Sequence, residues 1–288
     1  MPPRFIAEVS SNHHGSLDRC LSFIDAAARL GCDAVKFQLF RVNQLFAPEI
    51  LRASQAHRQR EAWELPVEFL PHLWQRCRDS GIEFGCTPFY LDAVNELMPY
   101  VDFYKIASYE LLWADLLGAC AQSGKPVILS TGMATILEVQ ASVKILRGSG
   151  CRDLTLLHCV SGYPTPCAEA NLAAIETIRN ATGCRAGWSD HSRNPGVIAR
   201  AVHRWGASVI EFHLDLDGKG DEYKSGHCWL PDEIAPVIDA VKSGFLADGN
   251  GIKAPAPAEM ADRDWRTDPA DGLRPFKKIR LGWKKEGN

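Results

Sequence analysis

The chain has 288 residues, a formal net charge of −3 and a hydrophobic share of 46%. This length suits one (β/α)8 barrel, and the small charge gives no general attraction to nucleic acid or anionic membranes. The N-terminus lacks the apolar core of a signal peptide, and no run of about 18 apolar residues follows. We therefore expect a cytoplasmic protein without a nucleic-acid or membrane partner, whose ten cysteines are free thiols.

Short runs rich in branched and aromatic residues alternate with stretches of helical periodicity. The expected strands are 5–9, 33–38, 82–87, 101–107, 126–130, 154–159, 185–188 and 208–212. The expected helices are 17–30, 66–80, 91–98, 112–123, 135–147, 168–181, 195–205 and 231–243. This alternation predicts an α/β protein with a (β/α)8 TIM barrel. A doubly wound sheet would need a Gly-rich phosphate turn after the first strand, which is missing.

Two segments do not fit the alternation. Residues 39–64 separate the second strand from its helix, and so long a connection in a compact domain is typical of a functional lid. Residues 247–288 are rich in Gly, Pro and charge and too short for another barrel-sized domain. We expect a catalytic barrel over 1–246 and an irregular C-terminal tail over 247–288 that forms no separate domain.

Most of the expected strands end in ionisable or hydroxyl residues. Because the carboxyl ends of barrel strands meet at one mouth, these side chains should gather there. Burying so many polar groups without partners is costly, so their shared position indicates a functional site. The residues concerned are Glu8, Lys36, Gln38, Thr87, Lys105, Ser108, Glu110, Ser130, Ser161, Tyr163, Ser189, Asp190, His191, Glu211 and His213.

Lys36 and Lys105 come from separate strands and can point at the same ligand. Together with nearby hydroxyl groups they would form a ring of donors around one phosphate group. The hydroxyl residues of this ring are Thr87, Ser108, Ser130 and Ser189. The alternative is an ion pair of either lysine with Glu8 or Glu211, which does not exclude phosphate binding.

His191 and His213 end neighbouring strands, beside Asp190 and Glu211. Two neutral imidazoles there can share a divalent ion and leave positions open for substrate oxygens. The alternative is that each is a hydrogen-bonded core histidine. Two histidine ligands with few carboxylates suit Mn²⁺, Fe²⁺, Co²⁺ or Zn²⁺ better than Ca²⁺.

Eight segments resemble, in the same order, the motifs of the sialic acid synthases, which include N-acetylneuraminate, pseudaminate and legionaminate synthases. They are IAEVSSNHHG, DAVKFQ, CTPF, YKIASYE, ILSTGMAT, LLHCVSGYPTP, WSDHS and VIEFHL. The resemblance implies a transferase that condenses phosphoenolpyruvate with an N-acetylated hexosamine aldehyde, such as N-acetylmannosamine, and releases phosphate. It also implies a homodimer and a divalent metal, typically Mn²⁺, with Mg²⁺, Co²⁺ and Zn²⁺ as alternatives.

The same resemblance assigns roles to individual residues. Phosphate contacts fall on the ring of lysines and hydroxyls, and metal ligands fall on His191 and His213. Contacts with the sugar, or handling of protons and water, are implied for Glu8, Gln38, Glu110, Ser161, Tyr163, Asp190 and Glu211. The glutamates Glu8, Glu110 and Glu211 are the candidate acids and bases, because carboxylates in a partly buried mouth can have raised pKa values.

Two features depart from the family pattern. Many relatives carry a C-terminal antifreeze-like domain, for which we expect this chain to be too short. After the last expected strand, DGKGDEYKSGHCWLP stands where relatives have an Asp-His-Lys-Ala-Ser-like stretch, and Asp221, Lys224 and His227 have no unique alignment to it. These departures bear on the sugar specificity more than on the chemistry.

Three other functions are alternatives for a barrel of this kind. A phosphoenolpyruvate-dependent synthase of 3-deoxy sugar acids from sugar phosphates would need extra Arg at the mouth, and the expected strand ends carry none. A metal-dependent sugar isomerase or epimerase would favour a carboxylate-rich metal site without paired lysines. A sugar-binding barrel without catalysis is disfavoured by the joint presence of Lys36, Lys105, His191 and His213.

Overall fold

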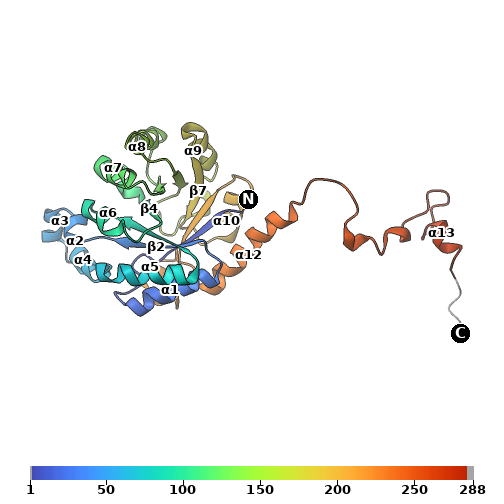
Figure 1. The fold of residues 1–288 in the computed structure, drawn as a ribbon, viewed down its shortest axis with the longest axis horizontal. Coiled ribbons are helices and arrows are strands. Elements are labelled where there is room, and N and C mark those ends of the chain that lie inside the picture. The colour runs from blue at the N-terminus through green and yellow to red at the C-terminus, as the bar shows by residue number, and fades with distance from the viewer. Residues whose placement is uncertain (1, 284–288) are drawn as a thin grey trace. The chain divides into compact units, whose positions relative to one another are not determined.

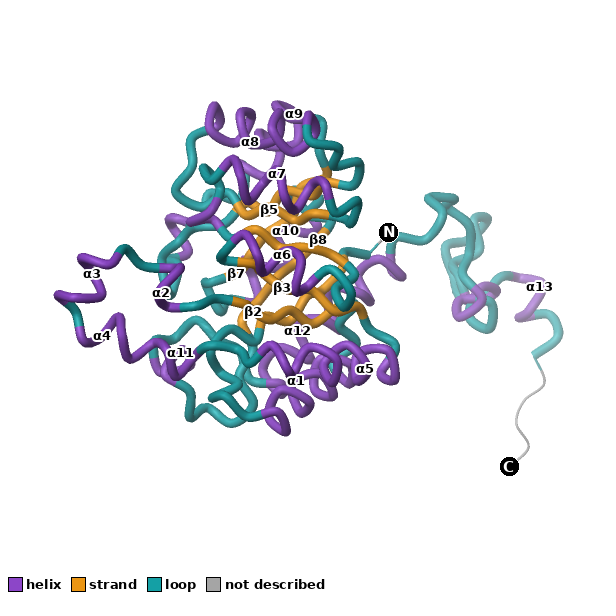
Figure 2. Tube along the Cα trace, turned by 60° about the vertical axis from the view of Figure 1, so that its left-hand side comes forward, coloured by secondary structure: helices purple, strands orange, loops and turns teal. Residues whose placement is uncertain are grey.

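The computed structural model describes residues 2–283 and contains a closed barrel of eight parallel strands surrounded by helices (Figures 1 and 2). The strands follow chain order around the barrel, and β1 pairs with β8 to close it. They are β1 (Arg4–Glu8), β2 (Ala34–Leu39), β3 (Glu83–Pro88), β4 (Phe103–Ile106), β5 (Val127–Ser130), β6 (Leu154–His158), β7 (Arg185–Asp190) and β8 (Val209–His213). The predicted (β/α)8 fold is confirmed.

The main helices lie between consecutive strands and after β8. They are α1 (Leu17–Arg29), α5 (Leu70–Ser80), α6 (Leu91–Leu97), α7 (Ala114–Gln122), α8 (Ile136–Gly148), α9 (Ala174–Thr182), α10 (Pro195–His203) and α12 (Pro231–Ala247). Local sequence sets several of their ends. Ser16 caps α1 through its side chain, and Thr135 and Glu138 form a capping box at α8. Gly81 ends α5 in the left-handed conformation, at φ 69°.

The expected long loop over 39–64 is instead mostly helical. It contains α2 (Val42–Leu45), α3 (Pro48–Ala53), α4 (Gln55–Arg58) and η1 (Gln59–Trp63), and α3 and α4 project from the barrel in Figure 2. Glu64 closes the base of the segment, because its carboxylate accepts from the Val42 backbone N–H at 2.6 Å and lies 3.4 Å from Arg41. Its role as a lid stays a prediction.

The barrel interior changes from apolar to polar along its axis. A small buried cluster draws one residue from each of six strands: Ile6, Ala34, Phe103, Ile128, Leu157 and Val209. Because side chains alternate between the two faces of a strand, residues two positions further along also point inward, one layer nearer the carboxyl ends. Those residues include Glu8, Lys36, Lys105, Ser130 and Glu211. The polar site therefore stands on an apolar floor inside a closed barrel.

Chain contacts divide the protein into two compact units, Met1–Phe245 and Leu246–Asn288. The first unit contains the barrel. Up to residue 283, the second contains short helical turns, η5 (Pro257–Glu259), η6 (Arg263–Trp265) and α13 (Lys277–Arg280), together with the end of α12. Residues 284–288 of the expected tail lie outside the described residues. Across residues 2–283, no helix combines the length and apolar character needed to cross a membrane.

Candidate active site

Two lysines and two glutamates form a buried charged group inside the barrel mouth. Lys36 forms an ion pair with Glu8, and its Nζ lies 3.9 Å from Glu211 Oε2. Lys105 Nζ lies 3.5 Å from Glu211 Oε1. All four residues are at most 3% exposed. The pairing that the sequence left open is therefore present, and it brings both ammonium groups to one carboxylate.

These charges shift one another's pKa values. Burial alone would raise the pKa of Glu211, but Lys105 and Lys36 outweigh burial and hold this pKa well below its ordinary value. Burial lowers the pKa of Lys105, and Glu211 offsets this only in part. Burial alone would lower the pKa of Lys36 as well, but Glu8 and Glu211 together raise it above its ordinary value. The neighbouring carboxylates thus compensate the charge of Lys105 less fully than that of Lys36. Lys105 is therefore the ammonium group more available to an incoming anion.

Hydroxyl groups on three strands surround this charged group. Lys36 Nζ donates to Thr87 Oγ1 at 3.1 Å, and Ser189 Oγ donates to Glu211 Oε1 at 2.9 Å. Ser130 is 3% exposed and belongs to the inward-facing layer of β5. The structure therefore brings Thr87 and Ser189 into contact with the charged group, and phosphate binding by this ring stays a prediction.

A second set of predicted residues meets around Gly132, just after β5. The Gly132 backbone N–H donates to Ser108 Oγ at 3.0 Å, and Ser108 Oγ lies 3.1 Å from Cys159 Sγ. A Cβ at Gly132 would lie 2.4 Å from Ser161 Oγ and 2.9 Å from Ser108 Oγ. Only a residue without a side chain lets these two serines approach the backbone so closely.

Glu110 is a buried carboxyl group on the short turn η3 (Ser108–Glu110) that follows β4. Within the described part of the chain, its Oε2 has no hydrogen-bond partner. Burial raises the pKa of Glu110 to about 7, although Lys105 acts in the opposite direction. A carboxyl group with this pKa can carry a proton near neutral pH.

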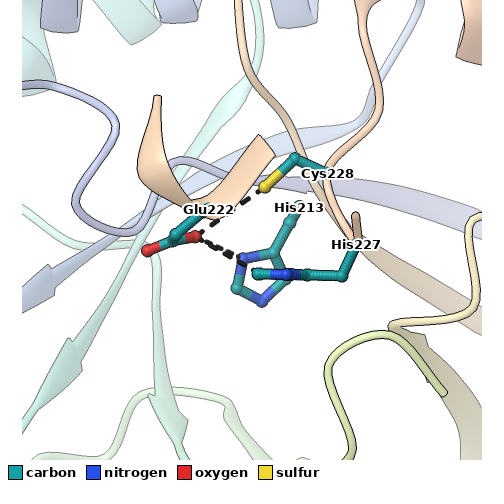
Figure 3. Close-up of side chains that lie close together, drawn as sticks. All are labelled: His213, Glu222, His227 and Cys228. Carbon is teal, nitrogen blue, oxygen red and sulfur yellow. Dashed lines mark hydrogen bonds and ion pairs between the residues drawn. The ribbon is translucent and has the colours of Figure 1, made fainter. Parts of the chain in front are cut away.

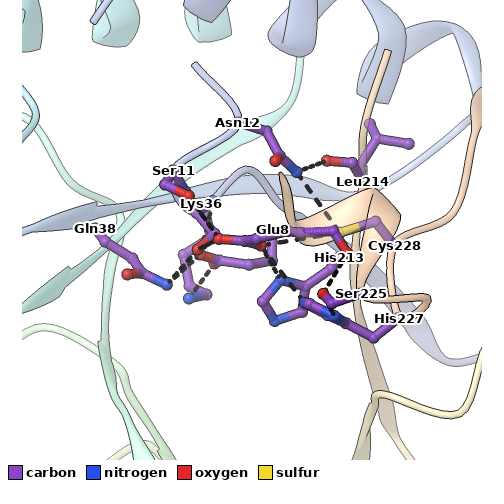
Figure 4. Close-up of polar contacts among 12 residues, drawn as sticks. Glu8, Ser11, Asn12, Lys36, Gln38, His213, Leu214, Ser225, His227 and Cys228 are labelled. Carbon is purple, nitrogen blue, oxygen red and sulfur yellow. Dashed lines mark hydrogen bonds and ion pairs between the residues drawn. The ribbon is translucent and has the colours of Figure 1, made fainter. Parts of the chain in front are cut away.

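Gln38 and Glu8 lie side by side at the ends of β2 and β1 (Figure 4). Gln38 Nε2 donates to Glu8 Oε1 at 2.8 Å and to Ser10 Oγ at 3.3 Å. The Ser10 backbone N–H also donates to Glu8 Oε1, at 3.0 Å. Glu8 is therefore held by an amide, a backbone N–H and Lys36, which fixes its carboxylate at the rim.

Asp190 is fully buried at the end of β7. Its Oδ1 accepts from the indole N–H of Trp188 at 3.0 Å, and its Oδ2 accepts from that of Trp229 at 3.1 Å. Both oxygens are used by protein donors, so Asp190 ties β7 to the segment after β8. Its expected contact with substrate stays a prediction.

His191, His213 and Tyr163 pack together at the mouth. The ring centroids of His191 and His213 are 5.3 Å apart, and the Tyr163 ring lies 4.2 Å from that of His191. His191 Nδ1 lies 2.8 Å from the Val160 carbonyl oxygen. Burial and the neighbouring His213 lower the pKa of His191 to about 3, so its imidazole is neutral. The structure thus brings the predicted metal pair together.

His213 also belongs to a group of metal-ligating side chains that the sequence reasoning did not assemble (Figure 3). We call His213, Glu222, His227 and Cys228 the His–Glu–Cys cluster; one ligand atom from each lies within 4.8 Å of the others. Glu222 Oε2 is central, at 3.1 Å from His213 Nδ1, 3.6 Å from His227 Nε2 and 3.8 Å from Cys228 Sγ. The available signal was the spacing Glu-x4-His-Cys in the segment between the last strand and the last long helix.

The segment after β8 folds back so that the cluster can form. The Trp229 backbone N–H donates to the His213 carbonyl at 2.8 Å, which returns the chain to the end of β8. The short helix α11 (Asp221–Lys224) carries Glu222. Asn12 Nδ2, from the loop after β1, donates to the Leu214 carbonyl at 2.9 Å and approaches Cys228 Sγ at 3.6 Å (Figure 4).

The close packing of the cluster shifts its pKa values. Burial alone would lower the pKa of His213, but hydrogen bonds with Cys228 and Glu222 raise it well above its ordinary value. Burial alone would raise the pKa of Glu222, yet hydrogen bonds with His213 and His227 hold it well below its ordinary value. The protein groups are therefore strongly coupled, and any bound cation would compete with protons for them.

Comparisons with known proteins agree with the barrel fold. A model of the NeuB family matches residues 23–253. An uncharacterized protein of Methanocaldococcus jannaschii is 36% identical over 90% of this chain and 75% of its own length. The N,N'-diacetyllegionaminic acid synthase of Campylobacter jejuni is 32% identical over 88% of this chain and 80% of its own.

Among solved structures, the N-acetylneuraminic acid (sialic acid) synthetase of Leptospira borgpetersenii matches with a TM-score of 0.80 and 31% identity. The match covers 94% of this chain and 93% of that one. The extent of the family match and the identity to these relatives show that the chain belongs to the NeuB family, an enzyme family that includes named acid synthases.

Proposed function

We propose that the protein joins phosphoenolpyruvate to an N-acetylated hexosamine aldehyde, such as N-acetylmannosamine, and yields a nonulosonic acid and phosphate. The observation that carries this proposal is the buried pair Lys36 and Lys105 at the mouth of a NeuB-family barrel. The names of the Campylobacter and Leptospira relatives support this class of product.

The charged group and its hydroxyl neighbours are proposed to bind the phosphate. Lys105 and Lys36 supply the positive charge, and the hydroxyl residues Thr87, Ser108, Ser130 and Ser189 supply further hydrogen bonds. Lys36, Lys105, Glu8 and Glu211 together carry no net charge when all four are ionised. Phosphoenolpyruvate adds several negative charges, so its binding requires another cation or a protonated carboxyl group nearby. Glu110 and a metal ion can meet that need.

The reaction needs two proton transfers. The methylene carbon of phosphoenolpyruvate forms the new bond to the aldehyde carbon, and the aldehyde oxygen takes up a proton. Water then adds to the former enol carbon and gives up the proton that the aldehyde oxygen requires. The hydroxyl group left on that carbon passes its own proton to the phosphate as the C–O bond to phosphate breaks, which leaves a keto group and hydrogen phosphate. Glu110 can hold the exchanged proton because its pKa is about 7. Glu211 stays ionised beside the lysines and stabilises positive charge at the enol carbon.

A divalent ion fits at His213, which is shared by the histidine pair and the His–Glu–Cys cluster. His191 is neutral, and one of its nitrogens is already engaged by the Val160 carbonyl, so the other is free to act as a ligand. Glu222, His227 and Cys228 offer further ligand atoms around Nδ1 of His213. When bound, such an ion would polarise the aldehyde oxygen as a Lewis acid.

A cytoplasmic location goes with this proposal. All ten cysteines are free thiols, and nine of them are buried. Buried free thiols are the usual state in a reducing compartment.

The proposal is tested by measuring phosphate release from phosphoenolpyruvate in the presence of Zn²⁺ or Mn²⁺ and a panel of aldehydes. We expect release with N-acetylmannosamine or with a bacillosamine-type N-acetylated sugar, and none with arabinose or erythrose phosphates. Release with the phosphorylated sugars alone would contradict the proposal and favour a 3-deoxy sugar acid synthase. Release without any sugar would indicate a phosphatase.

A further inference from the structure

Four potential ligands of three chemical kinds converge beside the end of β8: two imidazoles, a carboxylate and a thiol (Figure 3). We propose that the His–Glu–Cys cluster binds a divalent ion, and that its Cys228 thiolate makes this centre prefer Zn²⁺ to Mn²⁺. The proposal rests on the proposed function only in placing the ion at His213, and it names the ligands and the metal.

The distances suit a small tetrahedral ion. Zinc–nitrogen bonds of about 2.0–2.1 Å and zinc–sulfur bonds of about 2.3 Å separate tetrahedral ligands by roughly 3.3–3.6 Å. Glu222 Oε2 already lies 3.1, 3.6 and 3.8 Å from the other three ligand atoms. The widest separation in the cluster is within 4.8 Å, so small side-chain rotations bring all four atoms into range.

Burial and outer contacts hold the ligands in place. Cys228 is 0% exposed, His227 is 4% exposed and His213 is 8% exposed. Ser225 Oγ lies 3.0 Å from His227 Nδ1, which leaves Nε2 facing the cluster. Ser11 Oγ donates to Glu222 Oε1 at 2.8 Å, which leaves Oε2 for the ion. Such outer partners orient metal ligands in protein sites.

The thiol decides which metal the site prefers. Thiolate is a soft ligand that favours Zn²⁺, whereas Mn²⁺ favours oxygen ligands and binds more weakly to a given nitrogen or sulfur site. Zinc also expands from four to five ligands in catalytic sites, so a substrate oxygen can still bind.

The cluster and the pair His191–His213 make different demands on one imidazole. A neutral imidazole has one lone pair, so an ion on Nδ1 of His213 leaves the other nitrogen protonated. That nitrogen is then a hydrogen-bond donor, and His191 is free to face the substrate. The two arrangements therefore predict that different substitutions impair metal binding. Cys228→Ser should impair it if the cluster binds the ion, and His191→Ala should impair it if the histidine pair does.

The test is titration of the metal-free full-length protein with Co²⁺, without substrate, followed by near-ultraviolet spectroscopy. We expect a sulfur-to-cobalt charge-transfer band that is lost in Cys228→Ser and weakened in His227→Ala. It should persist in His191→Ala. Cys167→Ser is the matched control, because Cys167 is exposed and is the thiol most able to bind cobalt adventitiously.

Competition with a chelator then gives metal affinities. Cys228→Ser should lower the Zn²⁺ affinity by at least about 10–100-fold, the loss typical of disturbing even an outer partner of a ligand. The same substitution should reduce the difference between the Zn²⁺ and Mn²⁺ affinities. Circular dichroism checks that each variant is folded, and His227→Ala keeps the test decisive if Cys228→Ser fails to fold. Cobalt binding without the band, or a band lost only in His191→Ala, would overturn the proposal. These measurements need no turnover, so they fail independently of the proposed condensation.

Discussion

The lysine side and the histidine side of the mouth are built in different ways. Lys36, Lys105 and Glu211 all lie within strands of the closed barrel, where pairing on both sides fixes their positions. On the histidine side, only His213 lies within a strand, while His227 and Cys228 come from the segment after β8. Rigid strands thus carry the proposed phosphate chemistry, and a connection, which tolerates more sequence change, carries most of the proposed metal ligands.

Removal of His213 should have the largest effect, because both proposed metal arrangements use this residue. His213→Ala is expected to abolish metal binding and lower kcat by at least about 1000-fold, comparable to the loss of a main electrostatic group in other active sites. Metal analysis of the dialysed variant and steady-state kinetics measure the two effects. Normal turnover in a variant without bound metal would show that the reaction does not need a metal ion on the histidine side.

Lys105→Ala should impair the lysine side and leave metal binding on the histidine side intact. Since Lys105 is proposed to bind phosphate and not metal, the KM for phosphoenolpyruvate should rise by about 100-fold, which corresponds to about 2.7 kcal/mol, while the Zn²⁺ affinity stays unchanged. Lys144→Ala, which changes an exposed lysine of α8, is the control. An unchanged KM for phosphoenolpyruvate would count against the phosphate ring.

Glu110, beside the lysine side, should change its protonation state near neutral pH. Its pKa is raised from 4.5 to about 7 by burial, so the folded state binds a proton that the unfolded state has lost over this range. Its contribution to stability is therefore present below pH 4.5 and is lost as pH rises toward 7, by about 3 kcal/mol. Urea unfolding from pH 4 to 8 should show this decline in the wild type and a flatter profile in Glu110→Gln. Equal slopes for the two proteins would refute the shift.

Gly132→Ala should have a smaller effect, confined to the lysine side. The new methyl group would lie 2.4 Å from Ser161 Oγ and 2.9 Å from Ser108 Oγ, so one proposed sugar contact and one proposed phosphate donor must move. We expect kcat/KM to fall by about 10-fold, in line with the cost of overpacking. Gly148→Ala is the control, because a methyl group there would meet no atom within 4 Å other than those of its chain neighbours and its own helix backbone. Equal activity of the two variants would show that the packing around Gly132 does not matter.

The lysine side was largely predictable from the sequence, for a physical reason. Alternation along a strand and closure of the barrel determine which residues share the interior, and the register pairs Glu8 with both Lys36 and His213. The sequence therefore predicted that distant charges would meet, although it left open whether the lysines pair with Glu8 or Glu211.

The histidine side was less predictable because short segments lack periodicity. The four-residue helix α11 shows no amphipathic pattern, and only the return of the chain at Trp229 brings Cys228 back to β8. The short helices over 42–63 escaped prediction in the same way, since tertiary contacts such as that of Glu64 with the Val42 backbone hold them.

We propose above all that the lysine side activates phosphoenolpyruvate for carbon–carbon bond formation. Mass spectrometry of the products from phosphoenolpyruvate labelled with ¹³C at all three carbons tests it most directly. We expect a sugar acid that contains all three labelled carbons, with one phosphate released per product molecule. Recovery of the label as free pyruvate, with the sugar unchanged, would contradict it.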